Sequence, residues 1–153
     1  WERSLSLLDL MRTLQVTPNV FGLSACISAY DKGGQWESAL LLLDEMYKLG
    51  VTPNEYSFTS AISACQREGL WKQTLRLLDK MCMAEVTPNL VSFGAMISAC
   101  HNGGRWQRAL ELLNDMREAS VTPDVISFNA GMASCEKGGH WEHAVLLLRK
   151  MSK

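Results

Sequence analysis

The sequence predicts an all-α fold, a right-handed solenoid of stacked antiparallel helix-turn-helix units. Tryptophan, methionine and proline recur at an interval of 35 residues. Each interval holds two stretches with the apolar spacing of an amphipathic helix, and glycine separates the two. Sustained alternation of polar and apolar residues, which would indicate strands, does not occur in the sequence.

The 35-residue interval marks a tandem repeat. Comparing residues 55–89 with 90–124 position by position gives 16 identities in 35. The tetrapeptide Val-Thr-Pro-Asn/Asp closes four successive intervals. The recurring side chains are Trp1, Trp36, Trp71, Trp106 and Trp141, with Met11, Met46, Met81, Met116 and Met151.

The first segment of each interval carries the apolar stripe of a helix. Within 55–89 this stripe has the i, i+3, i+4, i+7 spacing of an amphipathic helix. Glycine follows in register, and it suits a helix end because it accepts left-handed backbone at little cost. The stripe is Phe58, Ala61, Ile62 and Cys65, and the glycines are Gly33, Gly34, Gly69, Gly103, Gly104, Gly138 and Gly139.

The second segment begins at the tryptophan and repeats the helical spacing. Proline in the closing tetrapeptide then prevents the helix from continuing. We expect the tryptophans and methionines to pack between units rather than to stack on a ligand. In the unit that begins at Val20 the stripe is Trp36, Ala39, Leu40, Leu43 and Met46, and the proline is Pro53.

A pair of helices of this length cannot bury its apolar face alone, so neighbouring units must stack, with the first helices lining a concave face. Neither end has the polar capping helix of a free-standing array, and we therefore expect an internal stretch of a longer solenoid. The expected units are a partial one at 1–19, complete ones at 20–54, 55–89 and 90–124, and one truncated at its C-terminus at 125–153.

The composition excludes several classes of protein. Hydrophobic residues make up 47% and charged residues 20%, which is too apolar for a disordered chain. The longest aliphatic runs, 39–43 and 144–148, are too short for membrane insertion. With 15 basic and 16 acidic residues the net charge is −1, whereas nucleic-acid-binding proteins normally carry a basic excess.

The period and the residue order resemble the pentatricopeptide repeat family, of the type with uniform 35-residue units, over the whole chain. The tetratricopeptide family has a period of 34 residues and lacks Pro-Asn/Asp at this place. The marks of the resemblance are aromatic-x-x-x-Ile/Met at 58–62, 93–97 and 128–132, Lys-Gly-Gly at 32–34 and 137–139, Ala-Leu…Met at 39–46 and 109–116, and the closing tetrapeptide.

The resemblance implies sequence-specific binding of single-stranded RNA, one base per repeat, in processing, stability or translation of RNA in a chloroplast or mitochondrion. Two side chains per unit would read the base edge, and a third would hold bases between neighbouring units. The early readers would be Ser24, Thr59, Gly94 and Asn129, and the last-residue readers Asn19, Asn54, Asn89 and Asp124. The base-sandwiching residues would be Phe21, Tyr56, Val91 and Ile126.

The reader pairs imply a core of A-A-G, 5′ to 3′. The units 20–54 and 55–89 resemble the adenine-selecting combination, because a hydroxyl plus an amide offers donors and acceptors to a purine edge. The pair of Gly94 and Asp124 resembles the guanine-selecting class more weakly. Its carboxylate accepts from the N–H donors of guanine, but Gly94 lacks the usual hydroxyl, so we expect the third base to be less defined.

Basic residues near the end of the first helix would, by the resemblance, approach phosphates and position the RNA without reading it. Lys32, Arg67 and Lys137 occupy this place, and Asn102 stands there in the unit 90–124. A cation there also interacts favourably with the helix dipole, so both interpretations stay open.

Other chemistry has little support in the sequence. Cys65, Cys100 and Cys135 share one repeat position, and units stacked about 10 Å apart lie beyond disulfide reach, so we expect buried reduced thiols. His140-x-x-His143 lacks further ligands at zinc spacing. Because no phosphate-binding loop or nucleophile–base pair stands out, we expect no enzyme activity, catalytic residue, metal or cofactor.

A protein-interaction scaffold is the alternative function, as a structural subunit of an organellar multi-protein complex. Solenoids offer extended surfaces to proteins as readily as to RNA. The near-neutral charge and the apolar side chains of Val91 and Ile126 suit this hypothesis. Release of the native protein by nuclease would distinguish the two.

Overall fold

The computed structural model describes Ser6, Thr13 and residues 18–151, apart from the side chain of Lys150. The second helix expected within 1–19, with Trp1 and Met11, lies outside the described residues. Over the continuous stretch 18–151 the elements are all helices. They are α2 (Val20–Lys32), α3 (Trp36–Lys48), α4 (Glu55–Arg67), α5 (Trp71–Met83), α6 (Leu90–Asn102), α7 (Trp106–Glu118), α8 (Val125–Lys137) and α9 (Trp141–Met151).

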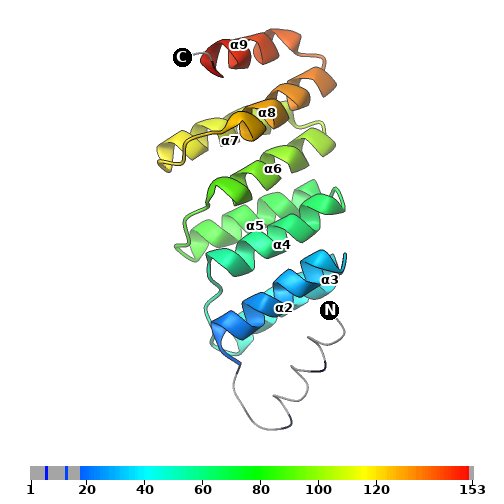
Figure 1. The fold of residues 1–153 in the computed structure, drawn as a ribbon, viewed down its shortest axis with the longest axis vertical. Coiled ribbons are helices and arrows are strands. Elements are labelled where there is room, and N and C mark those ends of the chain that lie inside the picture. The colour runs from blue at the N-terminus through cyan, green and yellow to red at the C-terminus, as the bar shows by residue number, and fades with distance from the viewer. Residues whose placement is uncertain (1–5, 7–12, 14–17, 152–153) are drawn as a thin grey trace.

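The helices stack along one axis as an all-α solenoid, from α2 at one end to α9 at the other (Figure 1). The first helices of the units, α2, α4, α6 and α8, pack on one another in sequence. Each of the second helices α3, α5 and α7 packs on the first helix of its own unit and on that of the next unit. The expected helical solenoid is confirmed, and its first helices share one surface, which we name the first-helix face.

The core repeats with the sequence. Phe58 and Ile62 of α4 are fully buried, as the apolar stripe predicts. The methionines Met46, Met81 and Met116 also have no exposed surface. The core interpretation of the methionines is therefore confirmed for these three residues.

Two of the tryptophans, Trp71 and Trp106, pack on the turn of the following unit, whereas Trp141 is 68% exposed. A Cβ atom placed on Gly103 would lie 2.6 Å from the Trp71 ring, and one on Gly138 would lie 2.6 Å from the Trp106 ring. The guanidinium of Arg105 lies 4.6 Å from the centre of the Trp71 ring, a distance typical of a cation–π contact. The expectation of packing between units holds for both tryptophans.

The last residue of each unit caps the next first helix. The side chains of Asn19, Asn54, Asn89 and Asp124 each accept a hydrogen bond from a backbone N–H in the first turn of the helix that follows. Asn and Asp are favoured at this position because their oxygen satisfies an N–H that lacks a partner within the helix. These four side chains therefore lie at the starts of the first helices. None of the helices in the described part of the chain is long and apolar enough to span a bilayer.

Candidate nucleic-acid interface

Four exposed apolar side chains form a row across the first-helix face. Phe21 is 73% exposed, Tyr56 54%, Val91 61% and Ile126 69%. They occupy the second residue of four successive first helices, which pack side by side. We name these four residues the apolar row. Apolar side chains that recur in register on a surface mark a binding site better than scattered ones do.

The tyrosine of the apolar row is held in place from the neighbouring unit. The Tyr56 hydroxyl donates to Ser28 Oγ of α2 at 2.9 Å. This bond ties the ring on α4 to the preceding first helix. An aromatic ring with a fixed hydroxyl and an exposed face is suited to stacking on a flat ligand.

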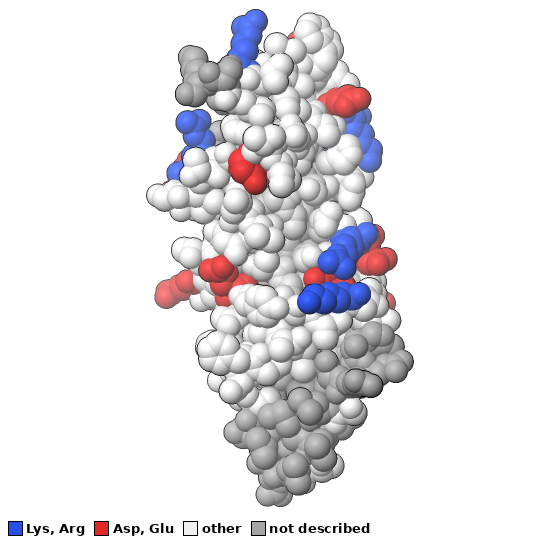
Figure 2. Space-filling view, viewed as in Figure 1, with Lys and Arg blue, Asp and Glu red and all other residues white. Residues whose placement is uncertain are grey.

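The middle of this surface carries little charge. Figure 2 shows the side on which α2, α4 and α6 face the viewer in Figure 1. Most of its Lys, Arg, Asp and Glu side chains lie towards the two margins, and an acidic patch lies nearer the midline in the upper half. A ligand on the middle of the face would therefore meet mainly apolar and neutral polar groups, with few carboxylates.

The reader positions of unit 20–54 are in direct contact. Ser24 Oγ lies 3.2 Å from Asn54 Oδ1 and 2.7 Å from Ser57 Oγ, and it donates to Val20 O at 2.6 Å. Asn54 Oδ1 also accepts from Ser57 N and Ser57 Oγ at 2.9 and 2.8 Å. Ser24 is only 1% exposed. The structure thus joins the two expected readers but engages the Ser24 hydroxyl within the protein.

The reader positions of unit 55–89 are arranged differently. Thr59 Oγ1 is covered by protein atoms and has no hydrogen-bond partner among the described residues. Asn89 Oδ1 accepts from Ser92 N at 2.8 Å, and Asn89 Nδ2 donates to Glu55 Oε1 at 2.6 Å. Here the reader amide is held by a carboxylate from the first residue of its own unit.

The third complete unit combines an open glycine with a capping carboxylate. A Cβ atom on Gly94 would meet nothing within 4 Å. Asp124 Oδ1 accepts from Ser127 N at 2.8 Å and from Ser127 Oγ at 2.7 Å. These bonds lower the pKa of Asp124 below its usual range, because they favour the charged form. Asp124 is thus an acceptor at neutral pH.

A groove continues the surface into the last unit. It has a volume of about 440 Å³ and is lined by residues of α4, α6 and α8. Two of its lining residues were expected in the site, Ile126 of the apolar row and the reader Asn129. Asn129 is exposed. The structure therefore brings a sandwich position and an early reader together at one concavity.

Two of the basic residues at the ends of the first helices contact the first helix of the preceding unit. Arg67 Nε lies 3.5 Å from Asp31 Oδ1, and Arg67 Nη1 donates to Asp31 O at 3.4 Å. Lys137 Nζ donates to Asn102 O at 3.0 Å. Cations here interact favourably with the carbonyls at a helix C-terminus, although Asp31 O also accepts from Gly34 N at 3.2 Å. Lys32 is exposed at the corresponding place in α2.

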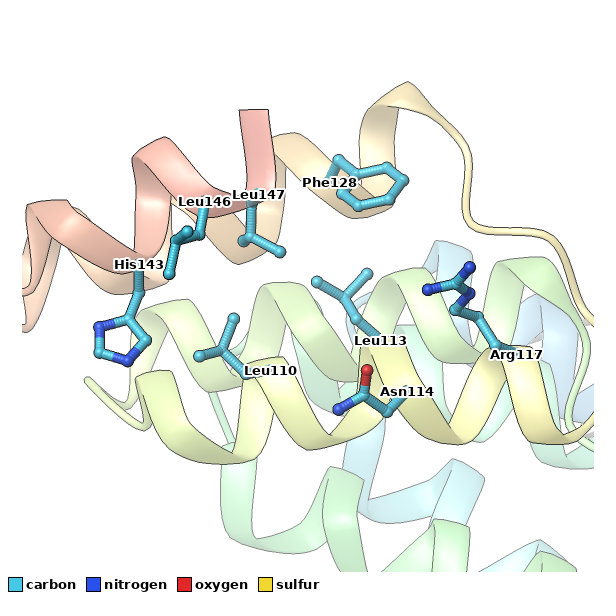
Figure 3. Close-up of a pocket in the computed structure, with 8 residues that line it drawn as sticks. All are labelled: Leu110, Leu113, Asn114, Arg117, Phe128, His143, Leu146 and Leu147. Atoms are coloured by element: carbon cyan, nitrogen blue, oxygen red, sulfur yellow. The ribbon is translucent and has the colours of Figure 1, made fainter. Parts of the chain in front are cut away.

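A separate cavity of about 200 Å³ lies between α7, α8 and α9 (Figure 3). Leu113, Phe128 and Leu147 border it with their apolar side chains, and Arg117 stands at one side. None of the expected site residues lines this cavity.

The cysteines and histidines have structural surroundings. Burial raises the pKa of Cys65 and of Cys100 to about 11, which keeps both thiols protonated and unreactive at neutral pH. The His140 and His143 rings pack on Trp106 with centroids 4.0 and 4.9 Å away. In the described part of the chain, no three His, Cys, Asp or Glu side chains are grouped to hold a metal.

Sequence reasoning missed two features of this site. One is the serine at the third helical residue, where Ser57 and Ser92 return a bond to the backbone N–H of the capping asparagine. The signal was present, because Asn followed three residues later by Ser has the spacing of a capping box. The other is Glu55, whose pairing across 34 residues depends on how the units stack.

Comparison with known families agrees with this architecture. The PPR repeat family matches residues 18–67, the pentatricopeptide repeat domain matches 76–137, and the PPR repeat matches 56–86 and 126–153. The chain belongs to the pentatricopeptide repeat family. Comparison with curated proteins gives no match.

Solved pentatricopeptide repeat structures share the fold. The PPR domain of Arabidopsis thaliana protein-only RNase P 1, in complex with tRNA, is 17% identical with a TM-score of 0.82, over 99% of this chain and 81% of that one. PPR10, a maize protein, in complex with an 18-nt psaJ RNA element is 23% identical with a TM-score of 0.75. That match covers 99% of this chain but only 26% of PPR10. Nuclear proteinaceous RNase P 2 from A. thaliana is 17% identical with a TM-score of 0.82, over 96% of this chain and 34% of that one.

Proposed function

We propose that this chain binds single-stranded RNA along the first-helix face, one base per 35-residue unit. The observation that carries the proposal is the apolar row, Phe21, Tyr56, Val91 and Ile126, exposed in register beside four capping amides and carboxylates. Apolar side chains can hold bases by stacking, while nearby polar groups read their edges. The RNA complexes of the similar structures support this use of the fold.

The capping role limits what each last residue can present to a base. Asn54 and Asn89 use Oδ1 to cap a helix, so the amide group Nδ2 is the part that can meet an acceptor on a base. Asp124 has oxygen acceptors only, which suit the N–H donors of guanine. On these grounds we propose the core A-A-G, with the third base less defined because Gly94 adds no side chain.

We expect weak binding of RNA, with a small electrostatic contribution from the phosphate contacts. Lys32, Arg67 and Lys137 are the proposed phosphate contacts, and two of them already bond to a neighbouring helix. Three phosphate contacts would give a slope of log affinity against log salt of about −2 for single-stranded RNA. We propose no catalytic role for the segment; its residues bind and position RNA.

The test is fluorescence anisotropy of the 153-residue chain with labelled RNA at low salt. An oligonucleotide containing A-A-G should bind more tightly than a scrambled one of the same composition. Asp124→Asn should move the preference at the third base from guanine towards adenine, because the variant offers an amide in place of a carboxylate. Equal binding of all scrambled sequences, or a native assembly that nuclease leaves intact, would contradict the proposal.

We also propose that the protein acts in a chloroplast or mitochondrion, in processing, stability or translation of RNA. The support is the uniform 35-residue repeat of this chain and its likeness to the family. A fluorescent fusion of the full-length gene product tests the compartment. Nuclear fluorescence, as the name of the second RNase P suggests for that protein, would contradict this part alone.

A further inference from the structure

The first residue of unit 55–89 differs from its equivalents in the neighbouring units. Glu55 is charged and exposed, whereas Val20, Leu90 and Val125 are apolar. Its Oε1 atom accepts a hydrogen bond of 2.6 Å from Nδ2 of Asn89, the last residue of the same unit. Short bonds of this kind, with an ionised acceptor, are stronger than those between neutral groups.

The bond fixes how Asn89 presents its amide. Oδ1 of Asn89 is committed to Ser92 N at 2.8 Å, so Nδ2 points to the other side, where Glu55 takes one of its two hydrogens. The second hydrogen is the donor left for a ligand. Glu55 therefore acts on the same atom that the proposed function assigns to base recognition.

Glu55 also lies on the same side of α4 as the other expected reader. Residues four apart on a helix are neighbours on one face, which places Glu55 beside Thr59. Thr59 Oγ1 lacks a hydrogen-bond partner among the described residues. Because Thr59 Oγ1 is covered by protein atoms, Glu55 and Asn89 are the residues that present polar groups to a base at this position.

We propose that Glu55 is a specificity-determining residue of unit 55–89, an inference that rests on the proposed RNA binding. Together, the carboxylate and the Asn89 amide offer an acceptor next to a donor. Adenine and cytosine present the complement, an amino donor next to a ring-nitrogen acceptor. Uracil places a carbonyl oxygen where those bases carry the amino group, and the carboxylate repels it. Glu55 therefore selects against uracil at the second base of A-A-G.

The experiment measures affinities of the 153-residue chain for four RNAs that differ only at this base. Wild type is compared with Glu55→Val, which installs the side chain found at Val20 and Val125, and with Glu55→Gln, which keeps the acceptor without the charge. Glu55→Val should reduce the preference for adenine over uracil by up to about fivefold, the upper end of the range of an exposed charged pair. The preference for cytosine over uracil should fall equally, and adenine over cytosine should not change.

Controls separate this role from others. Glu55→Gln should recover part of the preference, and Glu37→Val, an exposed charge loss on α3, should change the four affinities equally. The preferences at the first and third bases should stay as in wild type for every variant. If Glu55→Val shifts all four affinities by one factor, Glu55 acts only through charge and the inference fails. If wild type itself binds all four RNAs equally, base reading by Asn89 fails and the inference fails with it.

Discussion

The units 20–54 and 55–89 carry the same kind of reader pair, a hydroxyl and an asparagine, yet the structure uses them differently. In the first unit Ser24 and Asn54 form a hydrogen-bonded cluster with Ser57 of the next unit. In the second, Thr59 Oγ1 has no partner within the described chain and Asn89 is held by Glu55 at the surface. The difference teaches that two expected reader pairs of the same kind can be used differently: one is joined in a single hydrogen-bonded cluster, and the other is split into a covered hydroxyl and a surface amide.

The two units also differ at the linker before the closing tetrapeptide. Gly50 has φ 69, and Glu85 has φ 55 at the equivalent position. Left-handed backbone suits glycine but is costly for a residue with a side chain. The second unit thus carries strain that the first avoids.

The largest expected effect concerns the centre of the hydrogen-bonded cluster. Ser57→Ala removes a fully buried hydroxyl that contacts both Ser24 and Asn54, and should lower the free energy of unfolding by about 1 to 3 kcal/mol. Ser92→Ala is the matched variant, since Ser92 is equally buried but bonds to Asn89 alone. Urea denaturation of both should show the greater loss for Ser57→Ala. Equal losses would mean that the link to Ser24 contributes nothing.

The next largest change in stability is expected at the linker residues Glu85 and Gly50, which both have left-handed backbone. Glu85→Gly should raise the free energy of unfolding by up to about 1 kcal/mol, because it relieves left-handed backbone at a non-glycine residue. Gly50→Ala should lower it by a similar amount. Thermal denaturation of the two variants checks the opposite signs, and two shifts of the same sign would contradict this account of the linkers.

A smaller change in stability is expected from two variants that compare the hydroxyls of Ser24 and Thr59 directly. Ser24→Ala removes a bonded hydroxyl and should destabilise by roughly 0.5 to 1 kcal/mol. Thr59→Val removes a buried hydroxyl without a partner, so it should leave stability unchanged or raise it slightly. Destabilisation by Thr59→Val comparable to that by Ser24→Ala, measured in urea, would show that Thr59 is bonded in solution.

The smallest expected effect concerns the third unit, in which the helix-capping residue is the ionisable Asp124. The pKa of Asp124 is lowered in the folded protein by bonds from Ser127, so its stabilisation is complete above the unfolded pKa of about 3.9. This contribution is lost as the pH falls through the lower folded value. Asp124→Asn should therefore lose less thermal stability than wild type between pH 7 and pH 3. If wild type and Asp124→Asn lose the same thermal stability over this pH range, Asp124 does not contribute to the acid destabilisation.

The architecture could be predicted from the sequence because each of its determinants is local or strictly periodic. The stripe from Phe58 to Cys65, the glycine turns and the proline are short-range signals that recur every 35 residues. The tryptophan packing and the buried methionines followed from the same period.

The bonding state of the site could not be predicted in this way. The contacts of Ser24 with Ser57 and of Glu55 with Asn89 span 33 and 34 residues, and they depend on side-chain geometry between stacked units. The same is true of Arg67, whose approach to Asp31 spans 36 residues. Only the capping serines could have been identified from sequence, by their spacing from the asparagines.

The most direct test of the account is an affinity matrix, in which each base of A-A-G is replaced in turn by the other three and bound to the wild-type chain. Because Val20 stands where the second unit has Glu55, replacing the first base should weaken binding less than replacing the second, which faces the Asn89 amide and Glu55. A first base read as strictly as the second, or no dependence on either, would contradict the account.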